Sequence, residues 1–319
     1  MLFHEYYSEW MNVYKKGFVR PVTYQKYEMT LTRLKELAPE LKISELNKRT
    51  YQMLINSYAE NHERLTVMNF HHQLKSAIID AIDEKLIDSD FTRKVTIKGK
   101  SPAVKKPKFL SQQELKTLID QLDLSYLYRT FKLDIGKHKK RTYNTVNWDW
   151  LILLLAKTGL RFAEALGLTP NDFDFNNKKL KVSKTWNYKA NSGYDDTKNN
   201  SSKRTIDIDD QLSKQFYELI SKNEVECDKP IFVKDRVFNS TVNNRLDVLC
   251  KKANIPNVTI HGLRHTHASL LLYAGVSISS IAGRLGHANT TTTQETYLHI
   301  VKELENKDKD KVLEHLARL

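Results

Sequence analysis

Three separated motifs hold the side chains of this chain that are best suited to chemistry. They are Thr158-Gly-Leu-Arg161-Phe-Ala-Glu164, then His261-Gly-Leu-Arg264-His265-Thr-His267, and finally Leu285-Gly-His287 followed by Tyr297. Two arginines, two histidines and a tyrosine suit one task, which is to hold a phosphodiester while a phenolic oxygen attacks its phosphorus. The sequence therefore predicts that these motifs lie together in one site.

The two arginines have different expected surroundings. Arg161 follows an apolar stretch and should be partly buried, where a guanidinium group needs a partner. Glu164 lies three residues later on the same helical face and can hold it; taken alone, a structural ion pair is the simpler interpretation. Arg264 is near an expected helix N-terminus, capped by Thr259 or His261, where the helix dipole favours an anion. Its planar fork suits two phosphate oxygens better than a lysine would.

The histidines admit a metal site as the alternative. His261 and His265 lie four residues apart, with His267 and His287 nearby. Zinc usually needs such a spacing and a third ligand, but the neighbouring arginines repel a cation, so a phosphate is favoured and no metal is predicted. His261 is then a candidate proton acceptor or hydrogen-bond donor, while His265 and His267 support the site. A lone histidine at the position of His287 is usually a cap.

Tyr297 is one of 15 tyrosines, so its residue type alone indicates nothing. Its interest comes from its position, shortly after His287 and a threonine run that can cap a short helix. A free phenol has a pKa of about 10. It becomes a useful nucleophile where a base or clustered cations favour its anion, and Arg161, Arg264 and His261 can provide that environment.

The bulk composition narrows the class of protein. A length of 319 residues with 40% hydrophobic residues fits two folded domains. The net charge of +13 points to a polyanionic partner, most often nucleic acid, with an acidic membrane as the alternative. No apolar run reaches the roughly 20 residues of a bilayer span, and the start is not a signal peptide. Cys227 and Cys250 lack metal-ligand spacing, which indicates reduced thiols in a cytoplasmic protein.

The first part of the chain, up to about residue 92, carries the periodicity of helices, and its early aromatic stripe is best explained as core packing. Residues 93–108 are basic and contain no acidic residue, so we expect an extended tether that follows a phosphate backbone. Next comes a Ser111–Glu114 capping box. We assign residues 134–147 to a loop without a role. Later elements are a buried helix at 148–156, strands at 180–182 and 204–208 around a long hairpin, and helices at 211–223, 241–254, 262–273 and 277–285. The expected fold class is mainly α with a small antiparallel sheet (α+β).

The three motifs, in this order, resemble the tyrosine recombinase family of phage-type integrases and site-specific recombinases. The resemblance covers most of the chain and implies its domains. Residues 1–92 would form a helical core-binding domain that clamps DNA, residues 93–108 a linker, and residues 109–300 the catalytic domain. Residues 301–319 would form a tail that docks on a neighbouring protomer. Because the chain opens in the first helix of the core-binding domain, an arm-binding domain is either absent or missing from this fragment.

The resemblance also implies catalytic roles. Arg161 and Arg264 would contact the scissile phosphate, supported by Glu164 and His265. His261 and His287 would bond the phosphate, and Tyr297 would form a 3′-phosphotyrosine link. A hairpin lysine serves the family as general acid; Lys198 fits best here, with Lys184, Lys189 and Lys203 as alternatives. The residues that we expect to contact DNA are Lys26, Lys75, Lys98, Lys105, Lys106, Lys203, Arg204 and Arg245.

The implied function is site-specific recombination of double-stranded DNA, in the integration or excision of a phage or other mobile element. The reaction would need no metal, ATP or other cofactor. Four protomers would assemble on two DNA sites, associate weakly without DNA, and use accessory DNA-bending factors in a bacterial cytoplasm, at the nucleoid when active. The alternatives are strand relaxation by a type IB topoisomerase and DNA binding without catalysis.

Overall fold

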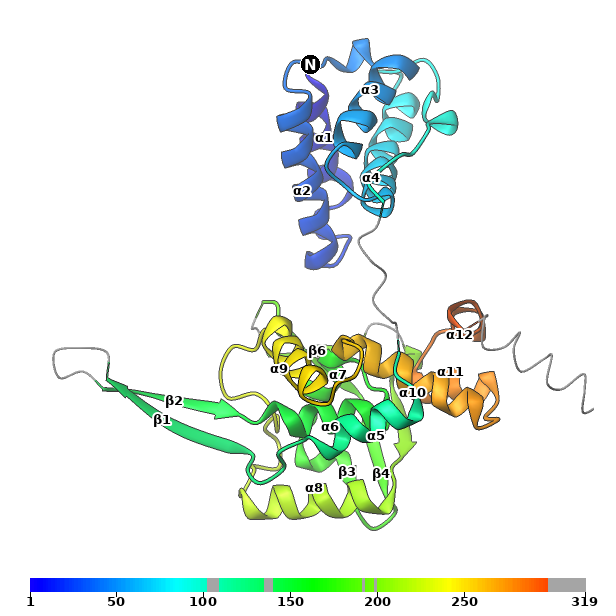
Figure 1. The fold of residues 1–319 in the computed structure, drawn as a ribbon. Coiled ribbons are helices and arrows are strands. Elements are labelled where there is room, and N and C mark those ends of the chain that lie inside the picture. Colours follow the sequence, from blue (N-terminus) through cyan, green and yellow to red (C-terminus); the bar gives the residue numbers. More distant parts are fainter. Residues whose placement is uncertain (102–108, 135–139, 191–192, 198–199, 298–319) are drawn as a thin grey trace, which may run out of the picture. The chain divides into compact units, whose positions relative to one another are not determined.

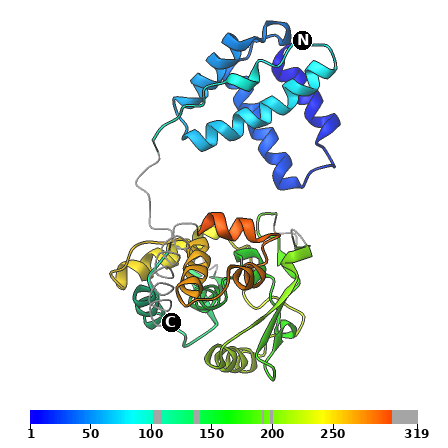
Figure 2. The ribbon, with the colours of Figure 1, turned by 90° about the vertical axis from the view of Figure 1, so that its right-hand side faces the viewer.

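The structure, a computed structural model, describes residues 1–101, 109–134, 140–190, 193–197 and 200–297 (Figure 1, Figure 2). The chain divides into two compact units, Met1–Lys105 and Lys106–Leu319. Both are mainly helical and the second adds small antiparallel sheets, which confirms the predicted fold class. None of the helices in these ranges has the length and apolar character that a membrane span requires.

The first unit is a helical bundle with its own core. The early aromatic stripe packs inside it, with Phe3, Tyr6, Tyr7 and Trp10 buried and only Tyr14 largely exposed, so the core-packing interpretation is confirmed. Its elements are α1 (Phe3–Tyr14), α2 (Pro21–Leu37), η1 (Ile43–Glu45), α3 (Lys48–Ala59), α4 (Arg64–Asp83) and η2 (Thr92–Lys94).

The beginning of the expected tether belongs to this first unit. Val95 and Ile97 pack against its core. The backbone of Thr96 exchanges two hydrogen bonds with the side-chain amide of Gln52, both at 2.9 Å. The N–H of Lys100 donates to a carbonyl before α4 at 2.9 Å. The expectation that an extended tether starts at residue 93 is therefore wrong, because apolar side chains within the basic segment pack against the core of the first unit. Residues 102–108 lie outside the described ranges.

Helix α6 (Trp148–Thr158) is the apolar centre of the second unit. Its residues 150–156 are buried on every side, and α7 (Phe162–Leu166), α9 (Asn239–Lys252) and α10 (Ile260–Tyr273) contact it. Asn147 caps its start, and Gly159 ends it in the left-handed region at φ +67°. That turn delivers Arg161 to the N-cap of α7. The remaining helices are α5 (Gln112–Asp120), η3 (Pro170–Asp172), η4 (Asn200–Ser202), α8 (Asp210–Lys222), α11 (Ile278–Leu285) and α12 (Thr290–Thr296).

The strands predicted at 180–182 and 204–208 do pair. Strand β4 (Lys179–Val182) lies between β3 (Phe173–Asp174) and β7 (Arg204–Asp207), with Leu180 opposite Ile206. Strands β5 (Lys184–Trp186) and β6 (Tyr194–Asp196) form a separate antiparallel pair. Because β7 follows the long hairpin and returns to β4, it carries Arg204 back towards α7 and α11.

The loop predicted at residues 134–147 is wrong. Strands β1 (Tyr128–Asp134) and β2 (Lys140–Val146) pair along their whole length, from Tyr128 opposite Val146 to Asp134 opposite Lys140. They form a ribbon that projects from the second unit (Figure 1). The many polar and basic residues of this segment hid the strand pattern, because a two-stranded ribbon need not bury an apolar face.

Arg245 on α9 supports the fold through a buried carboxylate. It binds Asp149, which is fully buried, through Nε–Oδ1 at 2.7 Å and Nη2–Oδ2 at 2.6 Å. We expect Arg245→Ala to lower the free energy of unfolding by about 3 kcal/mol, because it leaves a buried charge unpaired. Lys251→Ala, which removes an exposed ion pair on the same helix, should cost about 0.5 kcal/mol or less. Urea unfolding of both variants tests this; equal costs would contradict it.

Candidate active site

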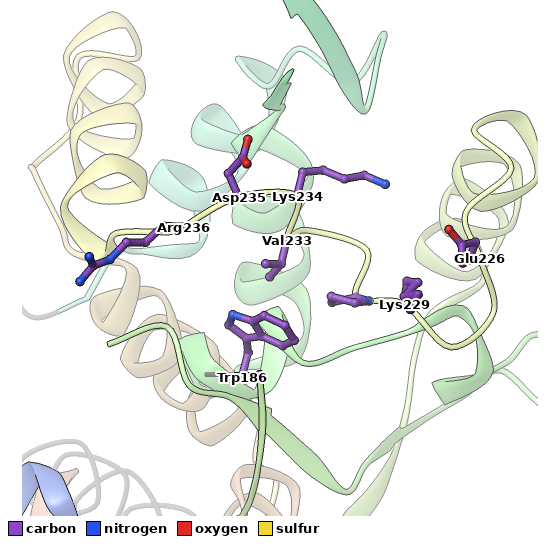
Figure 3. A pocket seen from close by; sticks show the side chains of 9 residues that line it. Trp186, Glu226, Lys229, Val233, Lys234, Asp235 and Arg236 are labelled. Atoms are coloured by element: carbon purple, nitrogen blue, oxygen red, sulfur yellow. The ribbon is translucent and has the colours of Figure 1, made fainter. Parts of the chain in front are cut away.

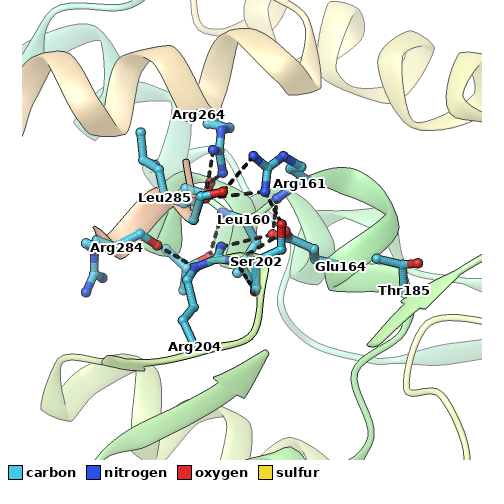
Figure 4. A network of polar contacts seen from close by, with 12 residues as sticks. Leu160, Arg161, Glu164, Thr185, Ser202, Arg204, Arg264, Arg284 and Leu285 are labelled. Atoms are coloured by element: carbon cyan, nitrogen blue, oxygen red, sulfur yellow. Dashed lines mark hydrogen bonds and ion pairs between the residues drawn. The ribbon is translucent and has the colours of Figure 1, made fainter. Parts of the chain in front are cut away.

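Arginines from separate elements form hydrogen bonds with backbone carbonyl groups at the carboxyl end of α11 (Figure 4). The carbonyl oxygen of Leu285 accepts hydrogen bonds from Arg264 Nη2 at 2.8 Å and from Arg161 Nη1 at 3.4 Å. The carbonyl oxygen of Gly286 accepts a bond from Arg161 Nη2 at 3.0 Å. Unpaired carbonyl groups at a helix end carry partial negative charge. This helix end therefore fixes the two guanidinium groups without neutralising them.

Glu164 supplies the carboxylate of the same network. It is 1% exposed and binds Arg204 through Nη2–Oε2 at 2.9 Å and Nη1–Oε1 at 3.2 Å, and Arg161 Nη1 at 2.8 Å. Burial acts to raise the pKa of Glu164, but the hydrogen bonds and charge of Arg204 and the charge of Arg161 outweigh it and hold the pKa below its ordinary value. We call Arg161, Arg204, Arg264 and Glu164 the arginine cluster.

Arg264 is almost fully buried within the arginine cluster. Its Nη1 donates to the carbonyl oxygen of Gly159 at 2.8 Å, in addition to the bond with Leu285. Desolvation, assisted by the charge of Arg161, lowers the pKa of Arg264 to about 9. The group remains a cation at neutral pH, and an anion bound beside it would offset its repulsion from Arg161.

Two histidines contribute uncharged rings to the site. His261 is exposed on the first turn of α10, yet desolvation by the surrounding protein and the charges of Arg264 and Arg161 lower its pKa. His287 bonds through Nδ1 to Thr293 Oγ1 at 2.7 Å. Burial, followed by the charge of Arg264, lowers the pKa of His287 to about 4. Both rings are neutral at pH 7 and can serve as hydrogen-bond partners of a phosphate.

Tyr297 follows α12 and is 2% exposed. Its hydroxyl is hydrogen-bonded to Nδ1 of His265 at 3.0 Å. Burial raises the pKa of Tyr297 to about 12, while the charge of Arg264 acts in the opposite direction. Because His265 follows Arg264 on α10, this hydrogen bond places the phenol beside the arginine cluster. The ring packs with Ala268, Leu272, Ile281 and Leu285.

Comparison with known proteins identifies the family. The sequence model of the phage integrase family matches residues 108–303, which is more than half of the chain. The chain belongs to the phage integrase family. It is therefore a tyrosine recombinase, an enzyme of site-specific DNA recombination, and this confirms the resemblance seen in its motifs.

Individual relatives align with nearly the whole length of this chain. The integrase of Staphylococcus phage L54a is 25% identical over 338 aligned positions, which span 98% of this chain and 92% of that protein. The transposase from transposon Tn916 of Enterococcus faecalis is 26% identical, over 92% of this chain and 74% of that protein. Among solved structures, the Tn1549 transposon integrase in complex with a circular intermediate DNA has a TM-score of 0.73 at 20% identity, covering 92% of this chain and 94% of that one. A lambda integrase dimer bound to a COC′ core site has a TM-score of 0.66 at 14% identity, covering 92% and 76%.

The integrase structure brings most of the predicted catalytic residues into one region. The rings of His261 and His265 meet edge to face, with centroids 4.9 Å apart, and His265 in turn bonds Tyr297. The predicted residues that lie together are Arg161, Glu164, His261, Arg264, His265, His287 and Tyr297.

The predicted general acid, Lys198, lies outside the described residues. Of its alternatives, Lys184 is paired with the buried Asp172 at 2.7 Å, which commits its ammonium group to the fold. Lys203 is exposed, 3.7 Å from the carboxylate of Asp196, and Lys189 is exposed as well. Lys198 remains the prediction for this role.

Arg204 is the site residue that sequence reasoning assigned elsewhere. We expected it to contact DNA, but its side chain is 7% exposed and its nitrogens bind Glu164, the carbonyl of Arg284 and the carbonyl of Ser202. The sequence carried no local signal for this role, because Glu164 lies forty positions away. The need for a second cation follows only from the structure, where Glu164 is buried and Arg161 is 38% exposed. Arg245 is likewise bound to Asp149.

The other residues that we expected to contact DNA are exposed, partly buried or outside the described ranges. Lys26, Lys98 and Lys203 are exposed, and Lys75 is partly buried. Lys105 and Lys106 lie outside the described residues. These assignments stay predictions.

His267 has a structural position. Its Nε2 accepts a hydrogen bond from Arg284 Nε at 2.9 Å, so its Nδ1 carries the proton and donates to the carbonyl oxygen of Ala156 at 3.2 Å. Burial lowers the pKa of His267 to about 3. Within the described part of the chain, no group of three His, Cys, Asp or Glu residues is placed to hold a metal.

A hollow of about 540 Å³ lies elsewhere on the second unit (Figure 3). Trp186 of β5 and the segment from Glu226 to Arg236 line it, and no residue of the arginine cluster does. The indole N–H of Trp186 is buried and has no hydrogen-bond partner among the described residues, but both basic and acidic side chains line the hollow. We assign the hollow no part in the chemistry.

The left-handed turn at Gly286 should be essential to the arginine cluster. It has φ +68°, and an added Cβ would lie 2.8 Å from Arg204 Nη1. We expect Gly286→Ala to destabilise the protein by about 1 kcal/mol or more and to reduce DNA cleavage. Gly283→Ala on the same helix meets nothing within 4 Å and should be neutral or stabilising by up to about 1 kcal/mol. Thermal unfolding and cleavage of the pair measure this; similar melting points would contradict it.

The charge of Glu164 gives a pH-dependent prediction. Because its folded-state pKa is depressed below the ordinary value of 4.5, its contribution to stability is present above that pH and is lost as the pH falls through the lower folded-state value. Glu164→Gln should cost about 3 kcal/mol at pH 7, and the difference from wild type should shrink below pH 4.5. Denaturant unfolding at both pH values tests it. Glu218→Gln, at an exposed ion pair, is the control with little effect at either pH.

Proposed function

We propose that this integrase cleaves and rejoins double-stranded DNA through a 3′-phosphotyrosine bond at Tyr297, and so inserts or excises a phage or another mobile element. The observation that carries the proposal is that Arg161 and Arg264 both bond the carbonyl oxygen of Leu285, while the hydroxyl of Tyr297 bonds His265, the residue that follows Arg264 on α10. Two fixed guanidinium groups suit the two non-bridging oxygens of a phosphodiester. The DNA complexes of the Tn1549 and lambda integrases support the choice of substrate.

The chemistry follows from this arrangement. The attack adds negative charge at phosphorus, and guanidinium groups that are positioned beforehand stabilise it without reorganisation. Neutral His261 and His287 hydrogen-bond the phosphate oxygens. Lys198 gives a proton to the leaving 5′ oxygen. The bond energy is kept in the phosphotyrosine link, so a 5′ hydroxyl from a partner strand can reverse the step without ATP.

The two units have different roles on DNA in this proposal. The first unit serves as the core-binding domain, with basic side chains such as Lys26 and Lys98 facing phosphates, which makes binding sensitive to salt. The second is the catalytic domain. Four protomers act on two DNA sites, with accessory DNA-bending factors assisting. Residues 301–319, for which we propose docking on a neighbouring protomer, lie outside the described residues. The enzyme works in the bacterial cytoplasm, at the nucleoid.

A nicked suicide substrate tests the reaction. After cleavage the short 5′-hydroxyl strand diffuses away, so wild-type protein should accumulate a covalent adduct that resists denaturation. We expect Tyr297→Phe to abolish the adduct, because the substitution removes the only reacting oxygen of the side chain. Tyr217→Phe, at an exposed tyrosine on α8, is the matched control and should form the adduct at the wild-type rate.

Two outcomes would contradict the proposal. An adduct that persists in Tyr297→Phe would mean that another residue is the nucleophile. Cleavage with relaxation of a supercoiled plasmid, but without exchange between two duplexes, would indicate a topoisomerase instead.

A further inference from the structure

His265 occupies a position between the phosphate-binding groups and the nucleophile. On α10, His261, Arg264 and His265 lie at positions i, i+3 and i+4 and share one face of the helix. The ring of His265 is 4.9 Å from that of His261 on one side and 5.8 Å from that of Tyr297 on the other, measured between centroids. Its Nδ1 lies 3.0 Å from the phenolic oxygen.

The nucleophile needs a proton acceptor. Burial holds the pKa of Tyr297 at about 12, so at neutral pH the phenol is protonated and a weak nucleophile. A base must lie within about 2.6–3.2 Å of the proton that it takes. Within the described residues, the hydrogen bond of this hydroxyl is the one to His265. His287 uses its Nδ1 for Thr293, and Arg264 is already a cation.

We infer that His265 is the general base of the cleavage step, an inference that rests on the function proposed above. This role requires that, in the resting enzyme, the hydroxyl of Tyr297 donates to Nδ1 and the ring proton is on Nε2. As the phenolic oxygen forms its bond to phosphorus, its proton passes to Nδ1 and His265 becomes an imidazolium ion. The bond from phosphorus to the 5′ oxygen breaks, and that oxygen takes its proton from Lys198. Rejoining reverses both transfers, so His265 returns its proton to Tyr297.

Two substitutions separate proton transfer from simple hydrogen bonding. In His265→Asn the side-chain amide can place an acceptor near the position of Nδ1 but cannot take up a proton. In His265→Ala both functions are lost. We expect both variants to lower the single-turnover cleavage rate on the nicked substrate by about 100-fold or more, with DNA affinity unchanged. The thermal melting point of His265→Asn should stay near that of wild type, which keeps the test valid if the alanine variant fails to fold.

A second substrate identifies which proton is affected. A 5′-bridging phosphorothiolate has a leaving group that needs no acid, so it should restore cleavage in Lys198→Ala but not in either His265 variant. Wild-type cleavage rates in His265→Asn would overturn the inference, as would rescue of that variant by the thiolate. Absence of any adduct with wild-type protein would instead reject the proposed function itself. The two failures are thus distinguishable.

Discussion

The site depends on how positive charges are held close together without being neutralised. In the arginine cluster three guanidinium groups face one carboxylate, which leaves a surplus of two positive charges even before Arg284 is counted. The carbonyl groups at the carboxyl end of α11 supply partial negative charge. They accept hydrogen bonds from the guanidinium nitrogens, but their partial charges do not cancel the full positive charges of the guanidinium groups. An anionic phosphodiester, whose charge grows during attack, is the partner that such a surplus favours.

The parts of this arrangement that depend on local sequence could be predicted. The capping box of Ser111 and Glu114 marked the start of α5, and the helix expected at 277–285 corresponds to α11. The i,i+3 spacing of Arg161 and Glu164 did produce an ion pair. The paired strands around Leu180 were visible from their alternation. In each case the determining contacts lie within a few residues, so the pattern carries the information.

The parts that depend on distant contacts could not be predicted. Arg204 joins Glu164 only because β7 pairs with β4 after a long hairpin, and nothing near Arg204 in the sequence announces that partner. Arg245 is likewise committed to Asp149, ninety-six positions away. The ribbon of β1 and β2 was missed for a related reason, since its strands satisfy each other and need no apolar face. Basic residues looked alike in the sequence, and burial separated those that hold the fold from those on the surface.

Tyr297, the nucleophile that we propose, is positioned by the same helices that hold the arginine cluster. Helix α12 has seven residues, mostly threonines, which are weak helix formers, so it cannot fix Tyr297 by itself. Packing supplies the position instead, and Leu285 has two parts in it. Its carbonyl oxygen accepts bonds from Arg264 and Arg161, while its side chain packs with Tyr297. A shift of α11 would therefore move the phenol and both guanidinium groups together, which couples the position of the proposed nucleophile to that of the proposed phosphate-binding groups.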